Sequence, residues 1–164
     1  MKFSAKLLIL FVMALLAFSS CNSAPKFSDV TGKEWLLIEV RTTPENITFD
    51  RKNLIAEGFG DIFTLNFDGE RLSGAGAPNR YTAPYTVDKN LVISVKPIAG
   101  TMMAPIREPE KLKEQEYFNY IQKAYKWNLF KENKKDKEGL LELYSKNTQG
   151  VEAVLVYQLG TTGK

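Results

Sequence analysis

The sequence predicts an α+β domain after an N-terminal signal peptide: a strongly curved antiparallel β-sheet or small barrel with one helix. Three observations predict this class. Apolar and polar residues alternate with period two along most of the chain, short polar turn-like runs separate these segments, and a single stretch has helical spacing instead. Closure into a barrel is expected because it removes exposed strand edges.

The N-terminus has the three-part layout of a secretory signal. Lys2 and Lys6 precede an apolar run, residues 7–18, and small residues follow it up to Cys21, the single cysteine of the chain. The apolar run is shorter than the ~20 residues that a helix needs to span a bilayer. A lipoprotein signal peptide over residues 1–20 is therefore predicted instead of a membrane-spanning helix.

The residues around Cys21 resemble a bacterial lipobox, in which the cysteine sulfur receives a diacylglycerol before cleavage just ahead of it. The stretch reads Ala-Phe-Ser-Ser-Cys, with Phe18 where leucine is common. We predict lipidation of Cys21, a lipidated tether over residues 21–29 and a folded domain over residues 30–160. The alternative is ordinary cleavage after Ser19, which would leave a free thiol near the new N-terminus.

The composition excludes several kinds of chemistry. The chain has no histidine, so Ser-His-Asp and Cys-His catalysis and His-ligated zinc are ruled out. Loss of residues 1–20 removes two lysines and no acid, which leaves 20 basic against 19 acidic residues and gives no argument for nucleic-acid binding. We predict no cofactor, no metal and no enzymatic activity, and a carboxylate-based enzyme is kept only as a residual alternative.

The first strands are predicted from period-two runs. In residues 34–40 the alternation places Leu36, Ile38 and Val40 on one face, and in residues 62–67 Phe63, Leu65 and Phe67 share a face. Asp68-Gly69 then reads as a tight hairpin turn into residues 71–73. Residues 43–61 have weaker periodicity and are predicted to form a long loop, in which Asn46-Ile47-Thr48 matches a glycosylation sequon by chance.

The middle of the chain continues the pattern and then breaks it. Residues 81–87 place Tyr81, Ala83, Tyr85 and Val87 on one face, and Pro84 indicates an edge or a bulge there. After a turn at 88–90, residues 91–95 form another strand. Residues 108–125 are predicted as one amphipathic helix with Leu112, Phe118, Ile121 and Tyr125 at helical spacing and Pro109 in the first turn. Strands follow at 125–131, 140–145 and 151–158.

Four motifs have a chemical reading and a plainer one. The plainer readings are favoured: an inter-strand turn at Gly74 and Gly76 over a phosphate loop, gap-filling by Met102 and Met103 over copper binding, and a solvated hairpin tip for the lysines between 131 and 137. The carboxylate pairs Asp68 with Glu70 and Glu114 with Glu116 lack the apolar setting that separates the pKa values of an acid and a base.

Several motifs in order resemble the META domain family, which includes the HslJ heat-shock lipoproteins. They are Asn79-Arg80-Tyr81, then Thr101-Met102-Met103-Ala104, then a helix with Glu116 and Phe118. The resemblance runs from about Val30 to Gln158. It implies a lipocalin-like curved sheet with one helix, an envelope location and a general link to stress tolerance, motility or virulence, without established catalytic residues.

The chain departs from the family pattern at two positions. Many members resemble Gly-Cys-Asn-Arg and Thr-Met-Met-Ala-Cys, and the two cysteine positions are here Pro78 and Pro105. If the two cysteines of other members normally form a disulfide in an oxidising compartment, the resemblance implies that both would be lost together, as they are here.

Two classes of function follow. The leading expectation is a lipid-anchored protein of the bacterial envelope with a non-enzymatic, structural or stress-related role through contacts with an envelope protein. Asn22 after Cys21 is not the aspartate that often retains lipoproteins at the inner membrane, so the outer membrane is favoured. The alternative is a small-ligand-binding barrel whose mouth is lined by aromatic residues. These would be Tyr81, Tyr85, Trp127 and Tyr144.

Overall fold

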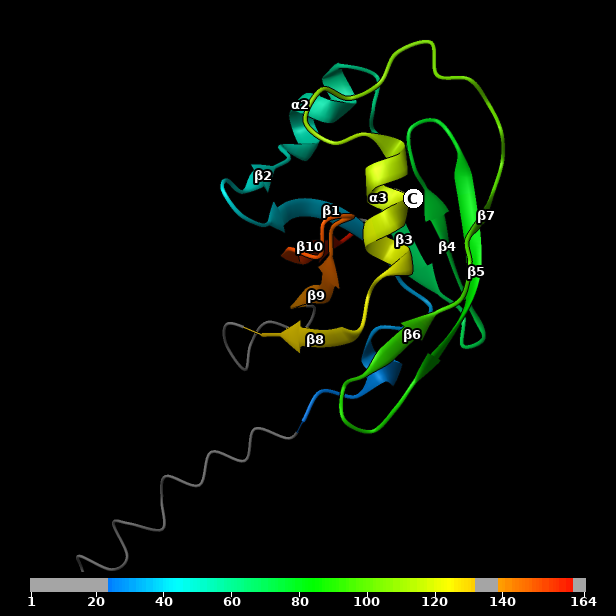
Figure 1. Cartoon of the computed structure of the whole chain (residues 1–164), viewed down its shortest axis with the longest axis vertical. Helices are drawn as coiled ribbons and strands as arrows, with labels where there is room; N and C mark the ends of the chain where they lie inside the picture. Colours follow the sequence, from blue (N-terminus) through cyan, green and yellow to red (C-terminus); the bar gives the residue numbers. More distant parts are fainter. Residues whose placement is uncertain (1–23, 132–138, 161–164) are drawn as a thin grey trace, which may run out of the picture.

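A computed structural model describes residues 24–131 and 139–160, which form a nearly closed antiparallel barrel with one main helix (Figure 1). The strand order is β6-β5-β4-β3-β1-β10-β9-β8, with β2 paired to β1 and β7 paired to β5. The predicted α+β class is confirmed. The strands are β1 (Glu34–Arg41), β2 (Ile47–Thr48), β3 (Thr64–Phe67), β4 (Arg71–Ala75), β5 (Arg80–Val87), β6 (Ile93–Val95), β7 (Ala99–Gly100), β8 (Lys126–Phe130), β9 (Leu140–Lys146) and β10 (Glu152–Leu159).

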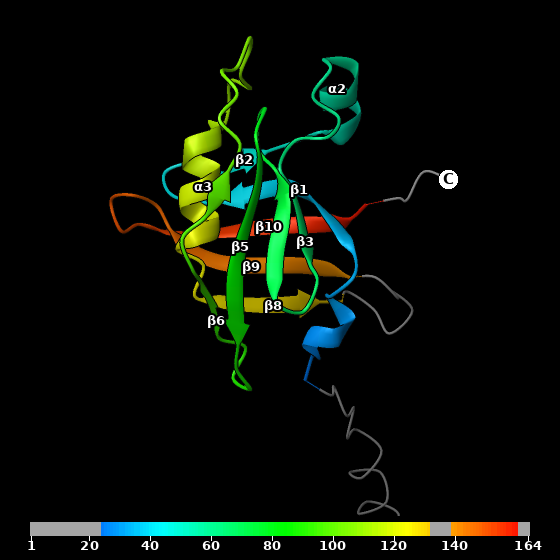
Figure 2. The same cartoon turned by 90° about the vertical axis from the view of Figure 1, so that its right-hand side faces the viewer.

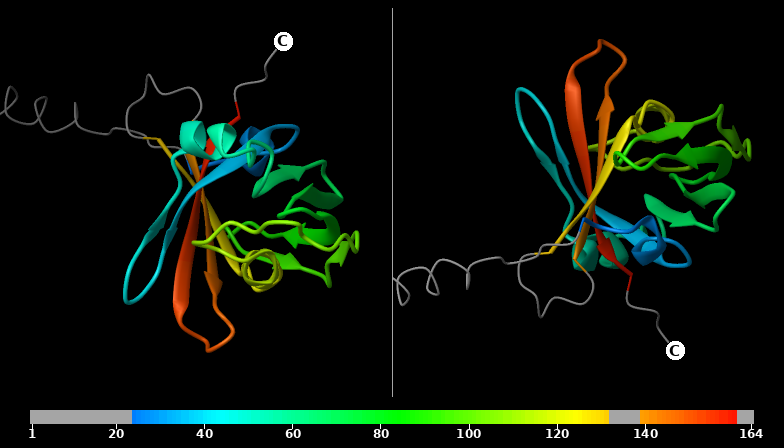
Figure 3. Two further views of the ribbon diagram at one scale, coloured as in Figure 1. Left: turned by 90° about the horizontal axis from the view of Figure 1, so that it is seen from above. Right: turned by 90° about the horizontal axis from the view of Figure 1, so that it is seen from below.

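Among the described residues, three helical segments accompany the sheet: η2 (Phe27–Asp29, a 3-10 turn), α2 (Arg51–Ala56) and α3 (Glu114–Gln122). The view from above in Figure 3 shows α3 end-on beside the curved sheet. Tyr117 of α3 contacts Phe63 and Tyr81, and the Tyr120 carbonyl accepts a hydrogen bond from Ser145 Oγ of β9 at 2.6 Å. The helix therefore packs against both arms of the sheet. Within the described ranges, no helix is long and apolar enough to cross a membrane.

The barrel closes where β6 meets β8. Val92 and Lys126 form an antiparallel bridge, Ile93 N donates to Tyr125 O at 3.1 Å, and Trp127 N donates to Leu91 O at 2.9 Å. This seam is short compared with the other strand pairs, so the barrel is closed by a few hydrogen bonds along one side.

The predicted inner face of β1 is wrong at two of three positions. Trp35 and Leu37 are fully buried, whereas Leu36 and Ile38 are only partly buried; Val40 is buried as expected. The pairing of β1 with β10 shifts register between Leu37 and Glu39, as in a β-bulge. The bulge adds one residue, so the inward face changes from odd to even positions along the strand.

The β3–β4 hairpin is confirmed. Phe63, Leu65 and Phe67 are all fully buried. Asp68 N donates to Arg71 O at 3.0 Å, and Gly69 has φ +105°, a left-handed conformation that favours glycine. The local alternation and the turn residues were therefore sufficient to locate this unit.

β5 has neighbours on both sides, so Pro84 does not lie on an edge strand. Tyr81 and Thr82 pair with β7, whereas residues 85–87 pair with β6. Pro84 lies between these two pairings, at a break in the neighbouring ladder where a missing N–H is tolerated. Val87, predicted to share the buried face, is 36% exposed.

Residues 43–61 are not one loop as predicted, because they contain β2 and α2. Asp50 caps α2 by accepting hydrogen bonds from Lys52 N and Asn53 N at 2.9 and 3.4 Å. Arg51 is buried, and its guanidinium donates to the carbonyl oxygens of Ile62 and Gly60. This short helix is held by such contacts more than by an apolar periodicity, which explains why the sequence pattern missed it.

The helix predicted over 108–125 is shorter. Residues up to Lys113 are irregular, Leu112 is buried ahead of the helix, and Tyr125 lies beyond it and is 39% exposed. Pro109 therefore does not lie in the first helical turn. The buried face of α3 consists of Tyr117, Tyr120 and Ile121.

Opposite ends of the barrel carry different segments (Figure 2). The chain enters at η2, at one end, while α2 and the segment between β7 and α3 lie at the other end. Phe27 of η2 packs against Phe67, Tyr85 and Trp127, with ring centroids 5.1, 5.6 and 4.8 Å apart. Cys21 and residues 132–138, where most of the predicted lysine-rich hairpin tip falls, lie outside the described residues.

Candidate functional site

The end of β4, at Gly74, and the turn that follows it, at Gly76, are shaped by close contacts with their neighbours, so only the second glycine lies in the predicted inter-strand turn. A Cβ atom at position 74 would lie 2.0 Å from the Thr64 carbonyl oxygen, and one at position 76 would lie 2.6 Å from Glu114 Oε1. At position 74 the contact is with backbone, so a side chain is excluded, whereas at position 76 the side chains of Glu114 and Phe118 would have to shift to admit one. These close approaches account for Gly74 and Gly76 without a phosphate ligand.

The side chain of Asn79 links three segments at the end of this turn. Its Nδ2 donates to Glu114 Oε2 at 2.7 Å and to Met103 O at 3.0 Å. Its Oδ1 accepts from Met103 N at 2.7 Å and from Thr101 Oγ1 at 2.8 Å. The amide is only 6% exposed, so its hydrogen-bonding capacity is used inside the protein.

Glu114, the first residue of α3, completes this network. Its Oε1 accepts from Ala77 N at 2.5 Å and from Asn79 N at 2.6 Å. One carboxylate therefore satisfies two backbone donors of the turn and one side-chain donor of Asn79. We call Asn79, Thr101, Met103 and Glu114 the Asn79 network.

The carboxylates that were considered as acid and base lie in separate contacts. Glu114 belongs to the Asn79 network, whereas Glu116 accepts from Tyr120 OH at 3.3 Å. Burial, reinforced by Glu116, raises the pKa of Tyr120 to about 12. Asp68 caps its turn by accepting from Arg71 N and Glu70 N, and these two hydrogen bonds lower the pKa of its carboxyl.

The motif residues beside Asn79 point to different surroundings. Arg80 is exposed, and its backbone N donates to Thr101 Oγ1 at 3.2 Å. Tyr81 is buried and donates to Thr64 O at 2.9 Å, with Tyr117 OH 3.1 Å away. The hydroxyl of Tyr157 reaches Tyr117 OH at 3.4 Å. Burial raises the pKa of all three tyrosines well above the usual value of 10.

The segment held by Asn79 presents apolar side chains to solvent. The backbone of Met103 is fixed at both its N–H and its carbonyl, yet its side chain is 54% exposed. Met102 and Ile106 are fully exposed. We call Met102, Met103 and Ile106 the exposed tip. The prediction that the methionines fill core gaps is therefore wrong.

The aromatic residues predicted to line a barrel mouth do not form one. Tyr81, Tyr85 and Trp127 are 3, 6 and 2% exposed and pack in the core. Tyr144 lies on the other face of the sheet, where its hydroxyl donates to Glu142 Oε2 at 3.1 Å. Three of these four rings therefore pack in the interior, and the four together do not surround an open site.

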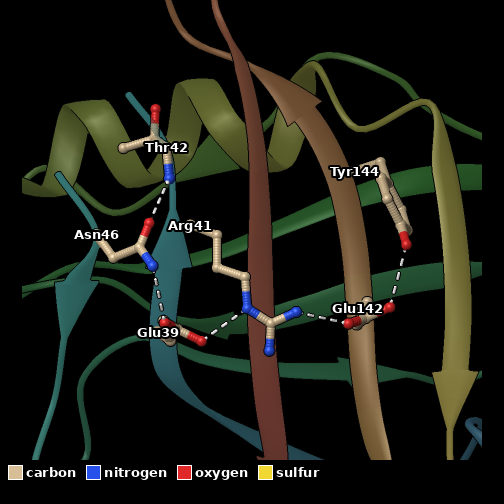
Figure 4. A network of polar contacts seen from close by, with 6 residues as sticks. All are labelled: Glu39, Arg41, Thr42, Asn46, Glu142 and Tyr144. Atoms are coloured by element: carbon tan, nitrogen blue, oxygen red, sulfur yellow. Dashed lines mark hydrogen bonds and ion pairs between the residues drawn. The ribbon is translucent and has the colours of Figure 1, made fainter. Parts of the chain in front are cut away.

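A polar network on the outer face of the sheet was not predicted (Figure 4). Arg41 reaches Glu39 at 2.8 Å and Glu142 at 2.9 Å, although β10 lies between the strands that carry these acids. The hydrogen bond that Arg41 Nε donates to the Glu39 carboxylate is the main cause that raises the pKa of Arg41. Asn46 accepts from Thr42 N and donates to Glu39. The network joins β1 and its connection to β2 with β9, across the intervening β10.

A groove of about 410 Å³ lies beside α2, between that helix and residues 107–111. We call it the α2 groove. Its apolar lining is Phe49, Leu54, Phe59 and Pro109, and its charged lining is Asp50, Glu57, Arg107, Glu108, Glu110 and Lys111.

The fold and this network define a class of domain: a small antiparallel barrel in which hydrogen bonds between Asn79 and Glu114 fasten the main helix to the turn after β4. A family model described as META domain matches residues 28–154. Since the match covers most of the chain, the protein belongs to the META domain family. No curated protein and no solved structure matches it. The family resemblance of Asn79, Arg80, Tyr81, Thr101, Met102 and Met103 therefore has a structural counterpart: these positions surround or extend the Asn79 network.

Proposed function

We propose that this protein is a lipid-anchored lipoprotein of the bacterial envelope, and that its META domain has a non-enzymatic, structural or stress-related role through contacts with another protein. The exposed tip is the observation that carries the protein-contact part. Three hydrogen bonds between the Asn79 side chain and Thr101 and Met103 hold a segment that presents Met102 and Ile106 fully to solvent. Clustered apolar exposure of this kind is typical of interaction sites.

The position of the tip fits a chain held at its other end. The described chain begins beside η2, and the segment with the tip lies at the opposite end of the barrel. The six residue-to-residue steps from Cys21 to Phe27 could reach at most roughly 20 Å if fully extended. An acyl group on Cys21 would therefore hold the η2 end near a membrane and turn the tip away from it. The outer membrane is favoured because Asn22, not aspartate, follows Cys21.

The anchor is tested by growth with radiolabelled palmitate. The wild-type protein is expected to incorporate label, and the Cys21→Ala variant is expected to incorporate none. A Ser23→Ala variant serves as the matched control and should label normally. Equal labelling of the wild type and Cys21→Ala would refute the anchor.

The protein contact is tested by placing a photo-crosslinking amino acid at position 102 in living cells. The same protein, identified by mass spectrometry, is expected in repeated experiments, and an Ile106→Ser substitution should reduce its yield. A crosslinker at Lys89, in the turn before β6 at the η2 end, is the control. Equal capture from both positions, or none from position 102, would contradict the proposal.

A further inference from the structure

The α2 groove has an apolar lining with a polar rim, the composition of a binding site for a mixed ligand. Phe49 and Leu54 are each 8% exposed, and Phe59 is partly buried. The groove adjoins the segment that carries the exposed tip, since residues 107–111 follow Ile106 directly. A protein seated on the tip would therefore have the groove within reach.

The two cations that line the groove are engaged in holding its walls together. Arg107 stacks over the Phe59 ring at 4.6 Å and donates to the Glu57 carbonyl oxygen. Lys111 Nζ donates to Thr48 O at 3.1 Å. These contacts tie residues 107–111 to the α2 side and leave the cations less able to meet a ligand.

Of the four acidic residues that line the groove, two use their side chains in contacts within the described residues and two do not. Asp50 caps α2, and Glu108 pairs with Lys113 at 3.4 Å. Glu57 and Glu110, one on each wall, are exposed, and in the described part of the chain no ion pair joins either of them to a cation. The groove thus offers an apolar surface between two available negative charges, and the complementary ligand is apolar with positive charge beside it.

We propose that the α2 groove binds an extended segment of a protein partner in which an apolar side chain neighbours a lysine or arginine. This inference rests on the protein-contact function proposed above and names the chemistry of the partner. The apolar side chain packs against Phe49, Leu54 and Phe59, and the cation lies near Glu57 or Glu110.

Binding of short labelled peptides tests the proposal. The full chain in nanodiscs of zwitterionic lipid is titrated with the blocked peptide Lys-Phe-Lys-Leu, with empty nanodiscs as the reference. Saturable binding is expected, together with at least tenfold weaker binding of Glu-Phe-Glu-Leu and of Lys-Ser-Lys-Ser. Replacing both carboxylates, E57Q with E110Q, should weaken binding about three- to tenfold, as expected for two exposed charge pairs.

Two variants keep the test specific. The pair E70Q and D88N removes the same charge from turns outside the groove and should leave binding unchanged. Asn53→Trp fills the groove without changing charge and should abolish binding. Absence of saturable binding, equal binding of the acidic peptide, or equal weakening by the control pair would overturn the inference.

The two proposals fail separately. If position 102 captures a partner while Lys-Phe-Lys-Leu does not bind, the groove inference fails and the protein-contact function stands. If the peptide binds as expected while position 102 captures nothing, the tip is not the contact site and the groove inference stands by itself.

Discussion

Replacing Asn79 with aspartate tests whether the Asn79 network holds the turn, the tip segment and α3 together. The substitution preserves shape and the oxygen that accepts from Thr101 and Met103. It replaces the donor Nδ2 with an oxygen facing Glu114 Oε2 at 2.7 Å and Met103 O at 3.0 Å. Two favourable contacts therefore become repulsive.

The loss in free energy of unfolding is limited by the cost of protonating one of the two facing carboxyl groups. Protonating a carboxyl group of ordinary pKa, about 4, costs about 4 kcal/mol at pH 7 and about 1.4 kcal/mol at pH 5. This cost limits the charge penalty, and loss of the bond to Met103 adds about 1 kcal/mol. Asn79→Asp should lower the free energy of unfolding by up to about 5 kcal/mol at pH 7 and about 2.5 kcal/mol at pH 5.

The sign of the pH dependence distinguishes this reasoning from simple loss of packing. In the variant, the two carboxyl groups at positions 79 and 114 share a proton that is bound more tightly in the folded state than in the unfolded chain. The stability of the variant relative to wild type is therefore greatest below about pH 4 and falls as pH rises. Urea unfolding at pH 5 and pH 7, compared with wild type, measures it. The same change at Asn147, whose Oδ1 only accepts from Gln149 N and Val151 N, is the control and should be nearly neutral.

A second substitution checks the assigned partner. Adding Glu114→Gln to Asn79→Asp exchanges the donor and acceptor between the two residues. Most of the lost stability should return, as a coupling energy in a double-mutant cycle. An equal loss at both pH values, or no recovery in the double variant, would refute the network as described.

Three further predictions concern the core and the outer face. Gly74→Ala should lower the free energy of unfolding by about 2–3 kcal/mol in urea unfolding, because its Cβ would lie 2.0 Å from the Thr64 carbonyl oxygen. Gly60→Ala should cost below about 1 kcal/mol, because its Cβ would come no closer than 3.2 Å to Ile55 Cγ1. Burial raises the pKa of Tyr81, Tyr117 and Tyr157, so the contribution of these neutral tyrosines to stability is complete below pH 10 and is lost at higher pH. Absorbance at 295 nm should therefore show these three tyrosines ionising only when circular dichroism reports unfolding. Ionisation of all seven tyrosines in the folded protein would contradict this. Arg41→Met should change the free energy of unfolding by less than about 1 kcal/mol in urea, because the Arg41 side chain is 43% exposed, and a loss above 2 kcal/mol would show that the outer network matters more than its exposure indicates.

The sequence was sufficient where structure is local. The β3–β4 hairpin was located because Phe63, Leu65 and Phe67 alternate cleanly and a glycine turn follows. In β1 the run Leu36-Leu37-Ile38 is apolar at every position, so alternation fits either face and the bulge decides which one is buried. Only the backbone pairing contains that information.

The candidate site was predictable in part. The family resemblance singled out Asn79, Thr101 and Met103, but their hydrogen bonds join residues 22 and 24 positions apart, and Glu114 is 35 positions away. No local periodicity reports such contacts. The exposed tip was missed for a related reason, since Met102 and Met103 were expected to fill core gaps, whereas the Asn79 network fixes the backbone of Met103 and both side chains are exposed.

The place of β1 in the sheet has a consequence for how the chain folds. β1 lies between β3 and β10, and its register with β10 pairs Trp35 with Leu159. The middle of the sheet therefore requires a strand from each end of the domain, which is a contact of very long sequence separation and slow to form. A chain that emerges N-terminus first can complete the β3–β4–β5 arm early, but β1 keeps one open edge until the last strand arrives. During that interval the molecule carries one unpaired strand edge at its centre, and this edge must be kept from pairing with other chains until synthesis is complete.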